Sequence, residues 1–247
     1  MIPRILFSTL LIPMGIICYS QDTTFFDKYN KTIGRNSAFY YQIQHVDNSH
    51  QKSYVVESFY MSGAKKDIQY YADEAFKEPI GIWKKWHPNN QLKEQETFVN
   101  GKLNDTLFTY WDDGQLKRTD LYDDGKFITG DCYNSQGKKI SYFDYEQMPK
   151  YPGGDKSLMR DIYLNIKMPQ IIRDKFLKVK VVAKFSVDSD GVVGDFEMIS
   201  GSYPEVNSEV KRVLLSLKKW KPDFIDGEPV KVWYTVPLTF ETKYYFH

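Results

Sequence analysis

The chain has 247 residues, and its 33 Lys and Arg against 32 Asp and Glu give a formal net charge of +1. Charged residues make up 26% and hydrophobic residues 42%, which excludes a wholly disordered chain and a multi-span membrane protein. The near-neutral charge also argues against binding of DNA or RNA through bulk electrostatics.

The first twenty residues are typical of a secretory signal peptide. Arg4 supplies a basic start, residues 5–17 form an apolar stretch, and Cys18-Tyr19-Ser20 provides the small residues of a cleavage site. The apolar stretch is shorter than the roughly 20 residues that a membrane-spanning helix needs. We therefore expect residues 1–20 to be removed and the protein to be exported. A retained inner-membrane anchor and lipidation of Cys18 are the alternatives, and the bulky Ile17 argues against lipidation.

A lead-in region, residues 21–54, precedes a pattern that recurs through residues 55–145. Each copy has an aromatic residue four positions ahead of a turn residue, and the copies lie at intervals of roughly 25 residues. The four turn residues are Gly63, Asn90, Gly114 and Gly137. Asn100-Gly101 and Asp124-Gly125 lie between them and are typical of two-residue hairpins, which require positive φ angles. The pattern predicts stacked β-hairpins that form one long antiparallel sheet.

These copies resemble MORN-type repeats, in a bacterial variant form. Regularly spaced aromatic side chains in such a stack are most simply structural, since they pack between neighbouring hairpins. The alternative is a recognition surface for peptidoglycan or another glycan. The rings that would form this surface are Trp83, Trp86, Tyr110, Trp111 and Tyr133.

A second domain, residues 146–247, begins where Met148–Gly154 brings two prolines and two glycines and stops the hairpin pattern. Apolar residues then recur at helical spacing until Pro169, and a short helical turn follows. Residues 178–187 alternate between apolar and polar, as does the last strand near residue 236. The order is helix, strand, strand, helix, strand. It predicts an α+β fold with two or three helices on a three-stranded antiparallel sheet.

The last predicted strand contains Pro237, and proline within a sheet is confined to edges, bulges and strand ends. A three-stranded sheet has two open edges, and an open edge can accept an extended peptide by strand addition. A homodimer through the same strand is the alternative occupant of that edge.

Residues 147–241 resemble the carboxy-terminal domain of the TonB family, and the opening Tyr151–Gly154 is similar to the branch found in Bacteroidetes-like bacteria. The matching segments are, in chain order, Met148–Gly154, Met168-Pro169, Phe185–Gly191, Trp220–Pro222, Gly227–Val230 and Tyr234–Phe240.

The resemblance implies a non-enzymatic periplasmic protein that contacts TonB-dependent receptors in the outer membrane. The receptor's plug would offer an extended segment that pairs with the last strand of the domain. The partner-binding residues that this implies are Asn165, Val230, Lys231, Val232, Trp233, Tyr234, Thr235 and Val236. Specificity would come from the alternate side chains Lys231, Trp233 and Thr235.

The chain departs from the family in its amino-terminal part. A repeat region stands where an energy transducer has a long Pro-rich spacer, and no amino-terminal anchor is evident. The alternatives are therefore a true membrane-anchored energy transducer with an uncleaved amino terminus, and a peptidoglycan-binding module that uses the aromatic repeats.

Residues that carry chemistry are few, and we expect no catalytic residues, no metal site and no cofactor. The four histidines do not occur at metal-ligand spacing with Cys or acidic residues, and no nucleophile motif or phosphate loop is present. His87, beside Pro88, is predicted to be a solvated loop residue. Cys132 is predicted to be a buried, inert thiol, and removal of Cys18 would leave no disulfide framework.

Overall fold

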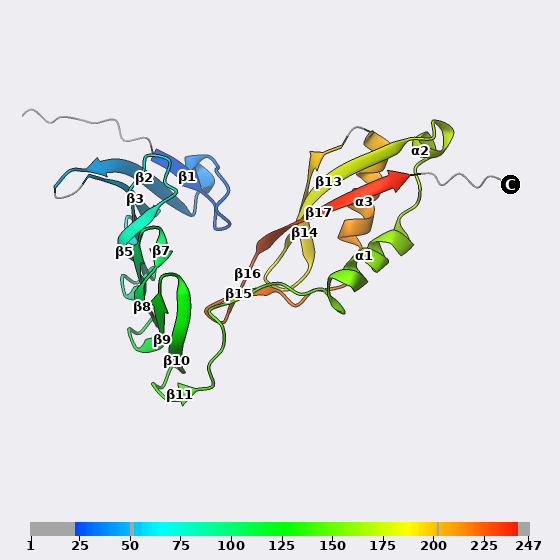
Figure 1. The fold of residues 1–247 in the computed structure, drawn as a ribbon. Helices are drawn as coiled ribbons and strands as arrows, with labels where there is room; N and C mark the ends of the chain where they lie inside the picture. The colour runs from blue at the N-terminus through cyan, green and yellow to red at the C-terminus, as the bar shows by residue number, and fades with distance from the viewer. Residues whose placement is uncertain (1–22, 50–51, 202, 242–247) are drawn as a thin grey trace, which may run out of the picture. The chain divides into compact units, whose positions relative to one another are not determined.

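A computed structural model describes residues 23–49, 52–201 and 203–241 of the chain. The predicted signal peptide and its alternatives fall on residues outside these ranges. The chain divides into two compact units between Ser141 and Tyr142 (Figure 1). The α+β class is confirmed, with a long antiparallel hairpin sheet in the first unit and helices on a small antiparallel sheet in the second.

The first unit is one 11-stranded antiparallel sheet in which strand order follows chain order, with β7 pairing beside β6. It also includes two strands from the stretch expected to be a lead-in region. A single 3-10 turn, Arg35–Ser37, interrupts the described strands of this unit. The strands are β1 Thr23–Phe26, β2 Tyr40–Asp47, β3 Ser53–Tyr60, β4 Lys65–Tyr71, β5 Pro79–Trp86, β6 Leu92–Val99, β7 Lys102–Leu103, β8 Asp105–Tyr110, β9 Leu116–Asp123, β10 Lys126–Tyr133 and β11 Lys139–Ile140.

The four predicted turns share one geometry. In each five-residue turn, the first N–H donates to the fifth carbonyl, and the fourth N–H donates to the first carbonyl. The fourth residue has positive φ, at 87° in Gly63, 68° in Asn90, 86° in Gly114 and 71° in Gly137. The predicted turn chemistry is therefore confirmed at all four positions.

The first residue of three of these turns also ties neighbouring copies together. Tyr60 Oη donates to the carbonyl of Trp86 over 3.1 Å, and Trp111 Nε1 donates to the carbonyl of Tyr133 over 3.3 Å. Between these two, His87 Nε2 lies 3.0 Å from the carbonyl of Tyr110. The prediction that His87 is only a solvated loop residue is wrong, because its ring holds one turn against the next.

The aromatic side chains of the repeats pack within the sheet. Trp83 lies against Tyr71 and Phe98, with ring centroids 5.0 and 4.6 Å away, and its indole N–H donates to the carbonyl of Tyr70 over 2.9 Å. The Trp111 ring lies under the ammonium of Lys117 at 4.5 Å. These contacts favour the structural interpretation of the aromatic pattern over a glycan-binding surface.

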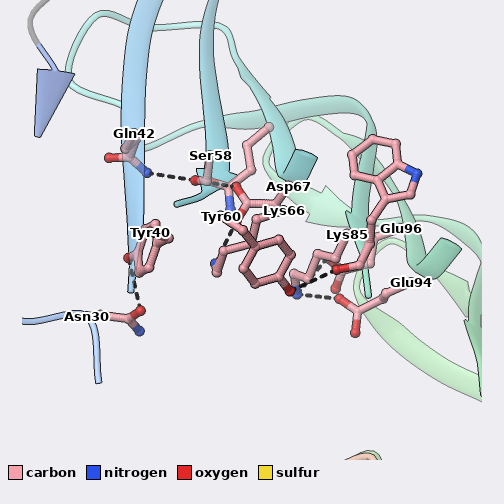
Figure 2. A network of polar contacts seen from close by, with 12 residues as sticks. Asn30, Tyr40, Gln42, Ser58, Tyr60, Lys66, Asp67, Lys85, Glu94 and Glu96 are labelled. Atoms are coloured by element: carbon pink, nitrogen blue, oxygen red, sulfur yellow. Dashed lines mark hydrogen bonds and ion pairs between the residues drawn. The ribbon is translucent and has the colours of Figure 1, made fainter. Parts of the chain in front are cut away.

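A row of polar residues crosses the sheet at one register position and is buried along most of its length. Figure 2 shows the part of this row from Ser58 to Glu94. Each member lies directly opposite the next on the neighbouring strand. From β3 to β9 the row reads Ser58, Asp67, Lys85, Glu94, Thr109 and Arg118. Sequence reasoning missed this row, because its members lie far apart in the chain and charged residues there suggest a solvated face.

Lys85, a member of this row, lies between two buried carboxylates of β6 (Figure 2). It forms an ion pair with Glu94 and a second with Glu96 at 3.7 Å. Burial raises the pKa of Glu96 to about 7. The ammonium of Lys85 lowers this pKa, and the carboxylate of Glu94 raises it. Burial disfavours the charge on Lys85, but the two carboxylates outweigh it and raise the pKa of that ammonium.

The raised pKa of Glu96 predicts a pH-dependent stability of the first unit. A carboxyl group whose pKa is higher in the folded than in the unfolded chain costs stability as the pH rises through that interval, here from about 4.5 to about 7. We compare the free energy of unfolding of Glu96→Gln with that of wild type at each pH. We expect this difference to favour the variant by about 2 kcal/mol more at pH 8 than at pH 5. Urea denaturation at both pH values measures this, and an equal difference at both would contradict it.

The second unit places helices on one face of a three-stranded antiparallel sheet, as predicted. The strand order of this sheet is β14-β13-β17. A separate three-stranded sheet has the order β12-β15-β16. The elements are β12 Glu146–Gln147, α1 Gly154–Asn165, α2 Gln170–Asp174, β13 Lys178–Val187, β14 Val193–Ser200, α3 Pro204–Leu215, β15 Asp223–Ile225, β16 Glu228–Val230 and β17 Val232–Glu241.

The core of this unit is apolar and continuous, and it includes the segment that precedes the first helix. Tyr151 is 3% exposed, and its ring lies 5.2 Å from that of Trp220. Its hydroxyl donates to Asp161 Oδ2 on α1 over 2.8 Å. Hydrogen bonds from Lys218 and from Tyr151 lower the pKa of Asp161 to about 2, so this carboxylate is ionised at neutral pH. The Tyr-Pro-Gly-Gly segment is therefore part of the folded domain.

Candidate functional site

Strand β17 forms an edge of its sheet. It pairs with β13 over ten residues, from Lys178 opposite Glu241 to Val187 opposite Val232, without a shift of register. Its other side has no paired strand within the described part of the chain. Most of the predicted partner-binding residues, 232–236, lie in this strand.

The two faces of β17 differ in chemistry. Tyr234 is half-buried, and Val236, Leu238 and Phe240 are buried against the core, as the alternation in the sequence predicts. Trp233 and Thr235 are exposed on the opposite face, where the ammonium of Lys184 lies 4.6 Å from the centre of the Trp233 ring. A strand added beside β17 would place alternate side chains next to these two surfaces.

The backbone of β17 presents hydrogen-bonding groups in a fixed order. The N–H of Val182 on β13 donates to Ser200 Oγ on the β14 side, over 3.1 Å. Val182 lies opposite Pro237. Because the N–H of Val182 points toward β14, these two residues form a pair that is not hydrogen-bonded across β13 and β17. The nitrogen of Pro237 therefore faces away from β13, at the outer edge of the sheet. Because orientation alternates along a strand, the N–H groups of Trp233 and Thr235 also face outward.

The half-buried ring of Tyr234 helps to fix the start of the strand. It packs 5.0 Å from Trp220 and 5.6 Å from Phe185, measured between ring centroids. Its hydroxyl donates to Asp155 Oδ1 over 3.2 Å. Burial raises the pKa of the Tyr234 hydroxyl, and the Asp155 carboxylate raises it further, so the hydroxyl remains a donor at neutral pH.

Lys231 is held by the β13–β14 hairpin. Its ammonium lies 2.7 Å from Asp195 and 3.1 Å from Asp188. Burial opposes the charge, but hydrogen bonds to these two carboxylates outweigh it and raise the pKa of Lys231. This side chain, expected to contribute to specificity, therefore pins the beginning of β17.

The remaining two predicted residues lie outside β17. Val230 belongs to β16 and pairs with Asp223, so it lies ahead of the last strand, which begins at Val232. Asn165 is the last residue of α1, where its amide donates to the carbonyl of Asp161 over 2.7 Å. Its own carbonyl accepts from Arg212 on α3 over 2.7 Å, so this residue fixes one helix against another.

Sequence reasoning missed the hairpin that leads into the edge strand. Asp226 and Gly227 adopt φ angles of 50° and 78° and connect β15 to β16. The Asp-Gly pair is a strong hairpin signal, but the strands on either side have three residues each, too short to show alternation. Pro229 lies opposite Phe224 in the middle of this hairpin.

Other kinds of site find little support within the described ranges. No group of three or more His, Cys, Asp or Glu is arranged to hold a metal ion there. Cys132 is 1% exposed, which confirms the prediction of a buried thiol. No described helix is both long and apolar enough to cross a membrane.

Residues 165–242 match the family model for the Gram-negative bacterial TonB protein C-terminal domain. The match covers about a third of the chain and includes β13, β14, α3 and β17. It confirms the resemblance that the motifs indicate for this part of the chain. It begins after the hairpin sheet, so the resemblance of that sheet to MORN-type repeats stays a prediction. No curated protein matches the chain.

Proposed function

We propose that this chain is a non-enzymatic periplasmic protein that binds a TonB-dependent receptor of the outer membrane by strand addition to β17. The C-terminal unit carries a TonB C-terminal domain, and proteins with this domain act in transport across the envelope. The observation that carries the proposal is the outer edge of β17, where the N–H groups of Trp233 and Thr235 face away from the sheet.

The mechanism is the pairing of two backbones. An extended segment from the receptor's plug accepts hydrogen bonds from these two N–H groups and donates to the outward carbonyls of the same strand. Lys231 and Tyr234 hold the strand in place before the partner arrives, which lowers the entropic cost of binding. Trp233 offers its exposed ring to a partner side chain, since 43% of its surface is accessible.

The test removes one donor without disturbing the sheet. Thr235→Pro eliminates an outward N–H, and Pro237 already occupies the equivalent orientation two residues later. We expect this variant to bind synthetic peptides from the plug segments of the organism's outer-membrane receptors at least tenfold more weakly than wild type. Binding is followed by amide shifts of the full chain, labelled at Trp, Thr and Val.

The matched control is Thr235→Val, which changes the same side chain but keeps the N–H group. It is expected to bind within about twofold of wild type. Equal affinity of Thr235→Pro and wild type, with both folded, would exclude pairing at this edge. So would an absence of amide shifts in β17 with every receptor peptide.

A further inference from the structure

We infer that prolines limit how much of the β17 edge can pair, so that the strand accepts a short extended segment and rejects the edge of a second copy of the chain. This inference rests on the strand addition proposed above. It concerns the length of the partner and its register, which strand addition alone leaves open.

Pro237 divides the outward donors of β17 into two groups. The pairing of Val182 with Pro237 sets which backbone groups of β17 face outward, and this orientation alternates along the strand. The residues whose backbone groups face outward are Trp233, Thr235, Pro237, Thr239 and Glu241. Proline has no N–H group, so the ladder of donors is interrupted between Thr235 and Thr239. A partner strand that runs past Pro237 leaves one of its carbonyls without a donor.

The preceding strand is interrupted in the same way. In the β15–β16 hairpin, the residues that flank the two-residue turn, Ile225 and Glu228, form the hydrogen-bonded pair. Pro229 is the next residue, so its nitrogen faces away from β15, at the outer edge of β16. The chain therefore carries one proline at the outer edge of β16, in the smaller sheet before the donors of Trp233 and Thr235, and a second at the outer edge of β17 after them.

A second copy of the chain fits this edge poorly. Two β17 strands paired side by side would place each Pro237 in the shared ladder and leave an unpaired carbonyl in each copy. An unsatisfied buried carbonyl costs more than a typical hydrogen bond contributes. Prolines on edge strands are one way in which proteins prevent edge-to-edge association.

A short segment avoids this cost. About five residues are enough to pair with the N–H groups of Trp233 and Thr235 and with the outward carbonyls through Pro237. These donors also belong to the part of β17 that is held by Lys231 and by the packing of Tyr234 on Trp220. The favoured partner is therefore a flexible segment with a short pairing stretch, and not a preformed sheet.

The first experiment needs no partner. Sedimentation equilibrium of the full chain compares wild type with Pro237→Thr, which restores the missing donor with a residue suited to strands. We expect Pro237→Thr to self-associate at least tenfold more tightly than wild type. Adding Thr235→Pro to this variant should return the association to the wild-type value. Self-association of wild type through β17, or no increase in Pro237→Thr, would overturn the inference.

A second experiment separates this inference from the proposed function. Thr239→Pro removes an outward donor beyond Pro237, and we expect it to bind the receptor peptides within twofold of wild type. If it weakens binding as much as Thr235→Pro, strand addition stands and the short window is wrong. If no peptide binds wild type while Pro237→Thr associates, the limit on the edge stands and the proposed partner is wrong.

Discussion

Replacement of Lys85 by methionine is expected to destabilise the first unit by about 3 kcal/mol, because it leaves two buried carboxylates without their cation. The stem of Lys85 is partly exposed, but the side chains of Glu94 and Glu96 are only 5% and 12% exposed. Urea denaturation of the full chain, followed through hydrogen exchange of the β5 and β6 amides, measures the change in the free energy of unfolding.

Two variants test the cause of this loss. Lys84→Met alters the neighbouring lysine of the same strand, which lies opposite Gln95 rather than a carboxylate, and should change stability by less than about 0.5 kcal/mol. Adding Glu94→Gln and Glu96→Gln to Lys85→Met should recover much of the stability, since no unpaired charge then remains. Equal losses for Lys84→Met and Lys85→Met would show that the ion pairs do not matter.

Replacement of Tyr151 by alanine is expected to destabilise the second unit by about 3–4 kcal/mol, the usual cost of removing a large buried ring. The ring packs on Trp220, which in turn contacts Phe185 and Tyr234. Tyr151→Phe should cost about 1 kcal/mol, because it keeps the ring and removes the hydrogen bond to Asp161. Thermal unfolding followed by hydrogen exchange in β13 measures both.

Met148 provides the control for that experiment. It lies in the same segment but is 63% exposed, so Met148→Ala should leave the stability within about 0.5 kcal/mol of wild type.

The role of Tyr151 also predicts the behaviour of a shorter fragment. A fragment that starts at residue 165, where the family match begins, lacks Tyr151 and most of α1 and should not fold. A stable, cooperative fragment of that kind would contradict the assigned role of Tyr151.

The sequence allowed prediction of the features that are written locally along the chain. Gly114 and Asn90 predict turns, because glycine and asparagine adopt positive φ angles at less cost than most other residue types. The alternation through Phe240 predicts a strand with one buried face. Each of these signals depends on residues that are close in sequence.

Features that depend on pairing between distant strands could not be predicted in this way. The polar row exists because register brings Lys85 opposite both Asp67 and Glu94, and nothing in the chain near residue 85 reports that alignment. Lys231 was expected to contribute to specificity because of its place in the alternation of the last strand, but its position beside Asp195 arises from the folded β13–β14 hairpin. The outward direction of Pro237 likewise required the register with Val182.

The strand order of the two units also has a consequence for the order in which they fold. In the first unit every strand pairs with a near neighbour in the chain, so each hairpin can add to the previous one as the chain emerges from its amino terminus. In the second unit β13 must wait for β17, which is separated from it by β14, α3 and a further hairpin. Contacts at short sequence separation form faster than contacts at long separation. The hairpin sheet should therefore be complete before β17, the edge strand proposed to bind the partner, has formed.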